Sequence, residues 1–156
     1  MNKHQHPIRE AERYLQNARS ILSEKAKKDG RYYHDKKYVR MAGNTAWNGV
    51  LIALDATFGI RKRLKSNQRL DFHDYQIAVS QRDHKMNIVL FAAYESLHKA
   101  MGYDGNPSYV VAQSALSDAN RIVEWADKNY QPTPEEIAEW QRKPNIFQRV
   151  YSLLFL

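Results

Sequence analysis

The side chains that could do chemistry in this sequence fall into two groups. The first group is polar and stands among apolar residues that recur at helical spacing: Asn44, Asn48, Asp55, Asp83 and His84. Amides, carboxylates and an imidazole together can hold a polar ligand or move a proton, provided that the fold brings them to one place. The first group is therefore a candidate polar site.

Asp83 is the most irregular member of this group. It stands between Val79 and Met86, where an apolar helix face would carry a leucine. An ionised carboxylate in such a place needs a partner, and Lys37, Asn44 or Asn48 could supply one. A buried ion pair, an amide contact or an edge position that reaches water would make Asp83 structural. A polar interior site would make it functional.

The second group is basic and lies in residues 24–40, where seven Lys and Arg side chains stand against three acids. The stretch RYYHDKKYVR interleaves rings with cations, as single-strand binders do, although a tyrosine at a helix boundary also serves packing. It offers these candidate nucleic-acid contacts: Arg31, Tyr32, Tyr33, Lys36, Lys37 and Arg40. A separate run at 61–69 carries five cations and no acid, and the whole chain has a net charge of +7. In a helical bundle these two basic segments would lie at opposite ends, about 30 Å apart.

Motifs for other chemistries are missing from the sequence. There is no cysteine, no HExxH pattern, no glycine-rich phosphate loop and no GxSxG serine. His73, His84 and His98 would be too far apart along one helix to share a metal ion. We therefore assign no catalytic residue, no metal and no cofactor.

Helical periodicity predicts the elements that position these groups. Apolar residues recur every three or four positions over 7–28, 36–58 and 71–101, and again from Asn106 or Ser108 to 129. Thr133 with Glu136 predicts a capped short helix that ends before Pro144. These spacings predict an all-α, up-and-down antiparallel four-helix bundle. We expect one domain over 1–156, with a core at about 7–129 and a C-terminal helical appendage at about 133–156.

The second helix carries a line of small residues, namely Ala42, Ala46, Gly49, Ala53 and Ala56. Small side chains let another helix approach closely, either within the bundle or across a dimer axis, and the central position of this helix favours the first. The last twelve residues, NIFQRVYSLLFL, are apolar enough to require cover from the bundle or from a second chain.

No secretory signal and no bilayer-spanning run is visible, so we expect a cytoplasmic protein without a membrane partner.

The run YVRMAGNTAWNGVLIALDATFG, after EAERYLQNARSIL, resembles the HEPN superfamily of small bacterial helical bundles over about residues 8–128. It is most similar to an uncharacterised bacterial HEPN-like family of unknown function. The resemblance implies a dimer and roles as an RNase, a toxin or a nucleotide-associated module. HEPN nucleases carry an Arg, four to six residues and a His. Here two residues separate Arg31 from His34, three separate Arg69 from His73, and one separates Arg82 from His84, so no RNase residue carries over.

Two hypotheses follow. The first is a non-catalytic binding or interaction module that forms a homodimer or takes a protein partner. It would use the C-terminal segment or a face around Ile77, Ile88 and Phe91. The alternative is an RNA-associated or toxin-like protein in which the polar group around Asp83 builds a divergent site.

Overall fold

Helices dominate the computed structural model, which describes residues 6–63, 65 and 67–142. The elements are α1 (Pro7–Glu24), β1 (Lys28–Asp29), β2 (Tyr32–Tyr33), α2 (Lys36–Phe58), η1 (Arg61–Arg63), α3 (Phe72–Arg82), α4 (His84–Ala93), η2 (Tyr94–Tyr103), α5 (Tyr109–Asn129) and α6 (Pro134–Arg142). Residues His6–Tyr130 form one compact unit, and α6 belongs to a second unit that is described by itself.

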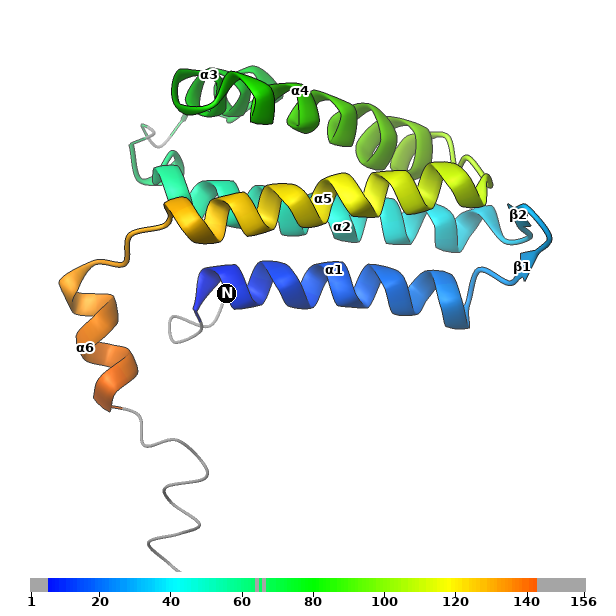
Figure 1. Cartoon of the computed structure of the whole chain (residues 1–156), viewed down its shortest axis with the longest axis horizontal. Helices are drawn as coiled ribbons and strands as arrows, with labels where there is room; N and C mark the ends of the chain where they lie inside the picture. Colours follow the sequence, from blue (N-terminus) through cyan, green and yellow to red (C-terminus); the bar gives the residue numbers. More distant parts are fainter. Residues whose placement is uncertain (1–5, 64, 66, 143–156) are drawn as a thin grey trace, which may run out of the picture. The chain divides into compact units, whose positions relative to one another are not determined.

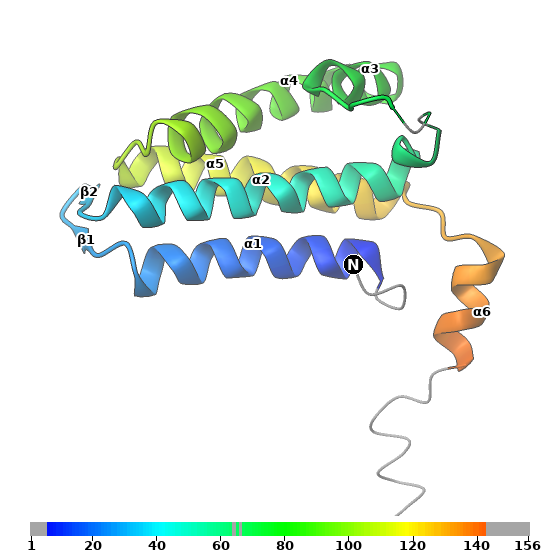
Figure 2. The ribbon, with the colours of Figure 1, turned by 180° about the vertical axis from the view of Figure 1, so that it is seen from behind.

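The chain of the main unit runs back and forth along its long axis. It follows α1, returns along α2, continues along α4 and η2, and returns along α5 (Figures 1 and 2). Helices α1 and η2 each contact both α2 and α5. Helix α4 contacts α5, and α2 contacts α5 as well. The core consists of the apolar faces that these helices turn toward one another.

Helix α1 begins as the sequence predicts and ends four residues early. Pro7 occupies the first turn, and the His6 imidazole accepts a hydrogen bond from the Ile8 amide at 3.2 Å. The predicted helix over 7–28 is wrong at its end, because Lys27 has a positive φ of 55° that a right-handed helix cannot contain. The chain instead forms the two-stranded hairpin β1–β2, with Gly30 (φ 58°) in its turn.

Helix α2 has its predicted bounds. Asp35 caps its start, and Gly59 ends it in the left-handed conformation. Ala42, Ala46 and Ala53 of the small-residue line are fully buried. A Cβ atom at Gly49 would lie 3.0 Å from the Ala11 carbonyl oxygen of α1. Helix α1 of the same chain therefore packs against this part of the line.

The predicted single helix over 71–101 is wrong. The chain breaks at Asp83, whose backbone is extended (φ −153°, ψ 101°), so that α3 ends and α4 begins there. The Phe72 ring, at the start of α3, stacks on the Tyr94 ring with 4.0 Å between centroids. In a continuous helix these residues would lie about 33 Å apart. Helix α3 therefore folds back along α4 instead of extending it.

Helix α4 continues directly into η2, which is a π-helix of ten residues. Such helices are rare and usually span a single turn. At this level α2 and η2 touch through their backbones. A Cβ atom at Gly43 would lie 2.6 Å from the Leu97 carbonyl oxygen and 2.8 Å from the Gly102 amide nitrogen. The absence of a side chain at position 43 permits this crossing.

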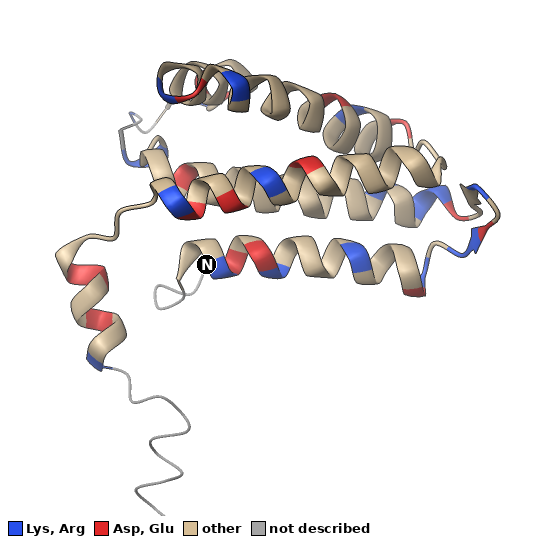
Figure 3. Cartoon of the chain, viewed as in Figure 1, with Lys and Arg blue, Asp and Glu red and all other residues tan. Residues whose placement is uncertain are grey.

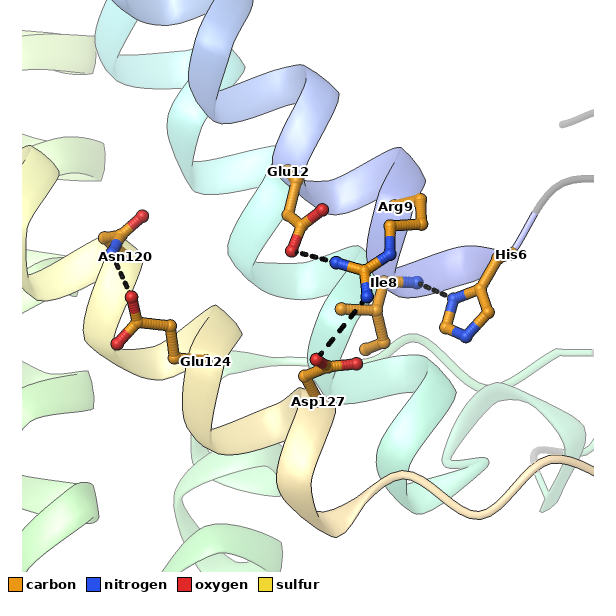
Figure 4. Close-up of polar contacts among 7 residues, drawn as sticks. All are labelled: His6, Ile8, Arg9, Glu12, Asn120, Glu124 and Asp127. Atoms are coloured by element: carbon orange, nitrogen blue, oxygen red, sulfur yellow. Dashed lines mark hydrogen bonds and ion pairs between the residues drawn. The ribbon is translucent and has the colours of Figure 1, made fainter.

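Helix α5 closes the core as the sequence predicts. The Ser108 hydroxyl caps it, and Ala112, Ala115, Ala119 and Ile122 are fully buried. Where its last turns pass the start of α1, Arg9 forms ion pairs with Glu12 at 2.6 Å and with Asp127 at 3.8 Å (Figure 4). These groups are exposed to solvent, so the pairs add little stability.

Helix α6 is capped as predicted. The Thr133 hydroxyl accepts from the Glu136 amide at 3.2 Å, and the Glu136 carboxylate accepts from the Thr133 amide at 2.8 Å. The predicted apolar tail at 145–156 lies outside the described residues. Among the described residues, no helix is long and apolar enough to cross a membrane.

Candidate functional site

The predicted polar residues of α2 lie on separate contacts. The Asn44 amide donates to the Gly102 carbonyl oxygen at 3.3 Å, which ties α2 to the end of η2. Asn48 is exposed. Asp55 lies eleven residues beyond Asn44, which is about 16 Å along a helix. These three side chains therefore share a line on α2 without sharing a ligand-sized site.

Asp55 joins three elements near the C-terminal end of α2. Its carboxylate accepts from the Tyr75 hydroxyl at 3.0 Å and pairs with the Arg61 Nε atom at 2.7 Å. Burial raises the pKa of Asp55 above its ordinary value, although Arg61 and Tyr75 act in the opposite direction. Burial and the neighbouring carboxylate raise the pKa of Tyr75 to about 12. These contacts hold α2, η1 and α3 together, so the role of Asp55 is structural.

Asp83 finds its partners away from α2. One carboxylate oxygen accepts from the Met86 amide at 3.0 Å and caps α4, and the other accepts from the Trp125 indole nitrogen at 3.1 Å. The prediction that Lys37, Asn44 or Asn48 would be the partner of Asp83 is therefore wrong. His84 is the exposed first residue of α4. The structure thus leaves Asn44, Asp55 and Asp83 in three different sets of contacts.

The basic stretch predicted at 31–40 forms one end of the main unit. The hairpin docks on the start of α5, because the Tyr33 amide donates to the Pro107 carbonyl oxygen at 2.8 Å and the Tyr109 amide donates to the Arg31 carbonyl oxygen at 2.9 Å. Lys and Arg positions are frequent along the ribbon of the hairpin and the start of α2 (Figure 3). We call this region, residues 24–40 with the start of α5, the hairpin end.

The six predicted nucleic-acid contacts divide at the hairpin end. Arg31, Tyr32, Lys36 and Lys37 are exposed. Tyr33 is buried, which raises the pKa of its hydroxyl despite a hydrogen bond with Gln113. Arg40 is also exposed, but its guanidinium donates to the Tyr103 carbonyl oxygen at 3.2 Å and packs against Gly105. Four of the six therefore remain available to a partner, and two hold the fold together.

Exposed apolar side chains mark the surface of α3 and α4. Ile77, Ile88 and Phe91 keep 43%, 61% and 50% of their surface exposed. Ile88 and Phe91 are three residues apart on α4 and so share one face of that helix. We call these two residues the α4 face. Phe91 also contacts the Phe72 ring, with centroids 6.4 Å apart, so the face borders the stack of Phe72 on Tyr94.

Sequence reasoning missed the hairpin and the role of Trp125. The hairpin had a signal, since Asp29-Gly30 is a typical turn dipeptide between residues that can pair as strands. Apart from its size, Trp125 had no sequence signal for its role, because the acceptor of its indole N–H lies 42 residues away in the chain.

Comparisons with known proteins give a family without an assigned activity. Residues 6–128 match the family described as Domain of unknown function (DUF5618). A solved structure, described as a protein of unknown function from Dyadobacter fermentans, is 38% identical in sequence and similar in fold, with a TM-score of 0.71. The match covers 78% of this chain and 93% of that chain. No curated protein matches. The chain therefore belongs to the DUF5618 family of helical proteins of unknown function.

Proposed function

We propose that the protein is a non-catalytic interaction module with the architecture of a HEPN-like, up-and-down four-helix bundle, and that it acts as a homodimer in the cytoplasm. In this assignment α1, α2, α4 with η2, and α5 are the four bundle helices. Helix α3 is an additional element that folds back along α4.

The α4 face carries the proposal. Ile88 and Phe91 are large apolar side chains that each leave half or more of their surface in water. A second copy that packed its own α4 against this face would bury Ile88 and Phe91 of both copies across a two-fold axis. The titratable residues that could have suggested catalysis support this choice, because Asp55 and Asp83 are occupied by hydrogen bonds that hold helices together.

The oligomeric state of the full chain tests the proposal. Light scattering after size exclusion should give a dimer for the natural sequence and a monomer for Ile88→Glu, because the glutamate would place two carboxylates at the symmetric contact. Val110→Glu is the matched control, since Val110 of α5 is also exposed, at 67%, and lies outside the α4 face. A monomeric natural chain, or an Ile88→Glu protein that stays dimeric, would refute the α4 interface.

A chain that ends at residue 142 separates the two predicted modes of association. It should remain dimeric if the α4 face is the interface. If it becomes monomeric while Ile88→Glu stays dimeric, the dimer depends on residues 143–156 and the α4 assignment is wrong.

A second function, association with single-stranded RNA, is favoured by the hairpin end. Arg31, Lys36 and Lys37 are exposed there, and so is Tyr32, at 60%. Cations that follow a phosphate backbone and a ring on which a base can stack are the elements of sequence-independent single-strand binding.

Salt-dependent binding tests this second function. The double variant Lys36→Glu, Lys37→Glu should bind a single-stranded oligoribonucleotide about tenfold more weakly than the natural chain at low salt, with a shallower salt dependence. The double variant Lys85→Glu, Lys128→Glu is the control, because it makes the same change in net charge at exposed cations of α4 and α5 and should change binding little. Equal loss in both variants would mean that net charge alone attracts RNA.

A further inference from the structure

A pocket of about 450 Å³ opens at the hairpin end, between α1, the β1–β2 hairpin and α5. Its inner surface includes Leu22, Tyr33 and Leu116, each at most 5% exposed. The proposed interaction surface on α4 does not contribute to it. The pocket is therefore a feature that the proposed function leaves unexplained.

Docking of the hairpin creates the walls of this pocket. The Tyr33 and Tyr109 rings lie at a tilt with 6.1 Å between centroids, and both line the pocket. Gln113, one turn beyond Tyr109 on α5, and Ser20 on α1 add an amide and a hydroxyl. A bound molecule would thus meet aromatic surface together with neutral hydrogen-bonding groups.

Two cations complete the lining, and no lining residue is acidic. Arg19 of α1 is half-buried. Within the described part of the chain, its guanidinium has no hydrogen-bond or ion-pair partner. The Lys28 ammonium lies 4.2 Å from the centroid of the Tyr109 ring, which holds it at the pocket wall. The half-buried, unpaired guanidinium contrasts with Arg9, Arg13 and Arg61, each of which has a carboxylate partner.

We infer that this pocket binds a small phosphate monoester with a ring. A phosphate monoester carries a charge of about −1.5 to −2 at neutral pH and presents three acceptor oxygens. Arg19 can donate a bidentate fork to two of these oxygens, and Lys28 supplies a second positive charge from another element. A carboxylate, with one negative charge and two oxygens, would leave one cation without a counterion.

The size and the lining of the pocket limit the rest of the ligand. A volume of about 450 Å³ accommodates a small organic molecule. The Tyr33 and Tyr109 rings and the side chain of Leu116 offer planar and apolar surface to a ring attached to the phosphate. A phosphodiester strand is a poorer match, because each of its phosphates carries a single charge.

Phenyl phosphate is the probe for the test, titrated calorimetrically into the full chain at fixed ionic strength. We expect saturable binding that weakens about tenfold or more in Arg19→Ala and in Lys28→Ala, since each change removes one charge-assisted contact. Ser20→Phe keeps both cations and fills the pocket, so it should weaken binding as well. Arg121→Ala is the control, because Arg121 pairs with Asp118 on α5 and does not line the pocket.

Each result decides for or against the site. Circular dichroism confirms that each variant is folded, and light scattering reads the proposed dimer independently of phosphate binding. Absence of binding, or binding that Arg19→Ala and Ser20→Phe leave unchanged, would overturn the pocket assignment. Benzoate that binds as tightly as phenyl phosphate would overturn the monoester assignment. So would an oligoribonucleotide without a terminal phosphate that displaces phenyl phosphate and loses as much affinity in Arg19→Ala.

Discussion

The backbone contact between α2 and η2 at Gly43 makes a quantitative prediction for Gly43→Ala. The added Cβ atom would lie 2.6 Å from the Leu97 carbonyl oxygen, 2.6 Å from the Met101 Cβ atom and 2.8 Å from the Gly102 amide nitrogen. Ordinary van der Waals contacts of a Cβ atom begin at 3.4 Å. Two of the three neighbours are backbone atoms of η2, which cannot rotate aside as a side chain can.

The size of the effect follows from two opposing contributions. Alanine stabilises the interior of a helix by about 1 kcal/mol relative to glycine. Overpacking costs about 1 to 3 kcal/mol, and the rigid neighbours place Gly43→Ala at the upper end of that range. The net result should be a loss of about 2 kcal/mol in the free energy of unfolding.

Gly49→Ala is the matched control, because it makes the same chemical change on the same helix. Its Cβ atom would lie 3.0 Å from the Ala11 carbonyl oxygen and from the Tyr14 Cβ atom, so its neighbours need to move by only a few tenths of an ångström. The gain in helix propensity and the cost of the contact then nearly cancel, and stability should stay within about 1 kcal/mol of the natural chain.

Urea denaturation followed by circular dichroism measures both variants at one protein concentration. The midpoint for Gly43→Ala should fall clearly below that for Gly49→Ala. A Gly43→Ala protein as stable as the natural chain would refute the close crossing of α2 and η2. A changed slope of the free energy of unfolding against urea concentration would instead indicate that the variant has a rearranged native state.

The remaining predictions concern the two carboxylates that hold helices together. Asp83→Ala should cost about 1 to 3 kcal/mol in urea denaturation, because the Met86 amide loses its cap and the Trp125 indole loses its acceptor. An Asp83→Ala protein as stable as the natural chain would show that neither contact contributes to stability. Tyr75→Phe should cost about 1 kcal/mol at neutral pH, since it removes the hydrogen bond to Asp55. The folded chain raises the pKa of Tyr75 from 10.0 to about 12, so the stability linked to its proton is complete below pH 10 and is lost as the pH rises toward 12. The natural chain should lose up to about 3 kcal/mol more than Tyr75→Phe over that interval in denaturation at stepped pH, and parallel losses would contradict the raised pKa.

Helix positions were predictable where local pattern and local caps agree. Helix α2 has its predicted bounds because Asp35 caps the start of a long apolar repeat and Gly59 caps its end. Helix α6 is another case, since Thr133 and Glu136 satisfy each other's backbone amides across one turn. Such signals operate within about four residues and need no partner from elsewhere in the chain.

Asp83 shows where that reasoning fails. Its periodic surroundings predicted a continuous helix, and a helix with an aspartate in its apolar face is an acceptable sequence. The break becomes favourable only because it caps α4, lets Trp125 donate to the carboxylate, and allows Phe72 to stack on Tyr94. Two of these three contacts join residues more than twenty positions apart, so no local pattern encodes them.

The sequence by itself determined the all-helical class, the main helices outside 71–101, the buried small residues of α2 and the basic character of residues 24–40. Those properties depend on spacing, caps and charge, which are local. Only the tertiary structure decided that Asn44, Asp55 and Asp83 serve separate contacts, and that Arg19, Lys28 and Tyr109 meet around one pocket. The reason is physical: a site depends on which helix faces meet, and the packing of distant side chains selects those faces.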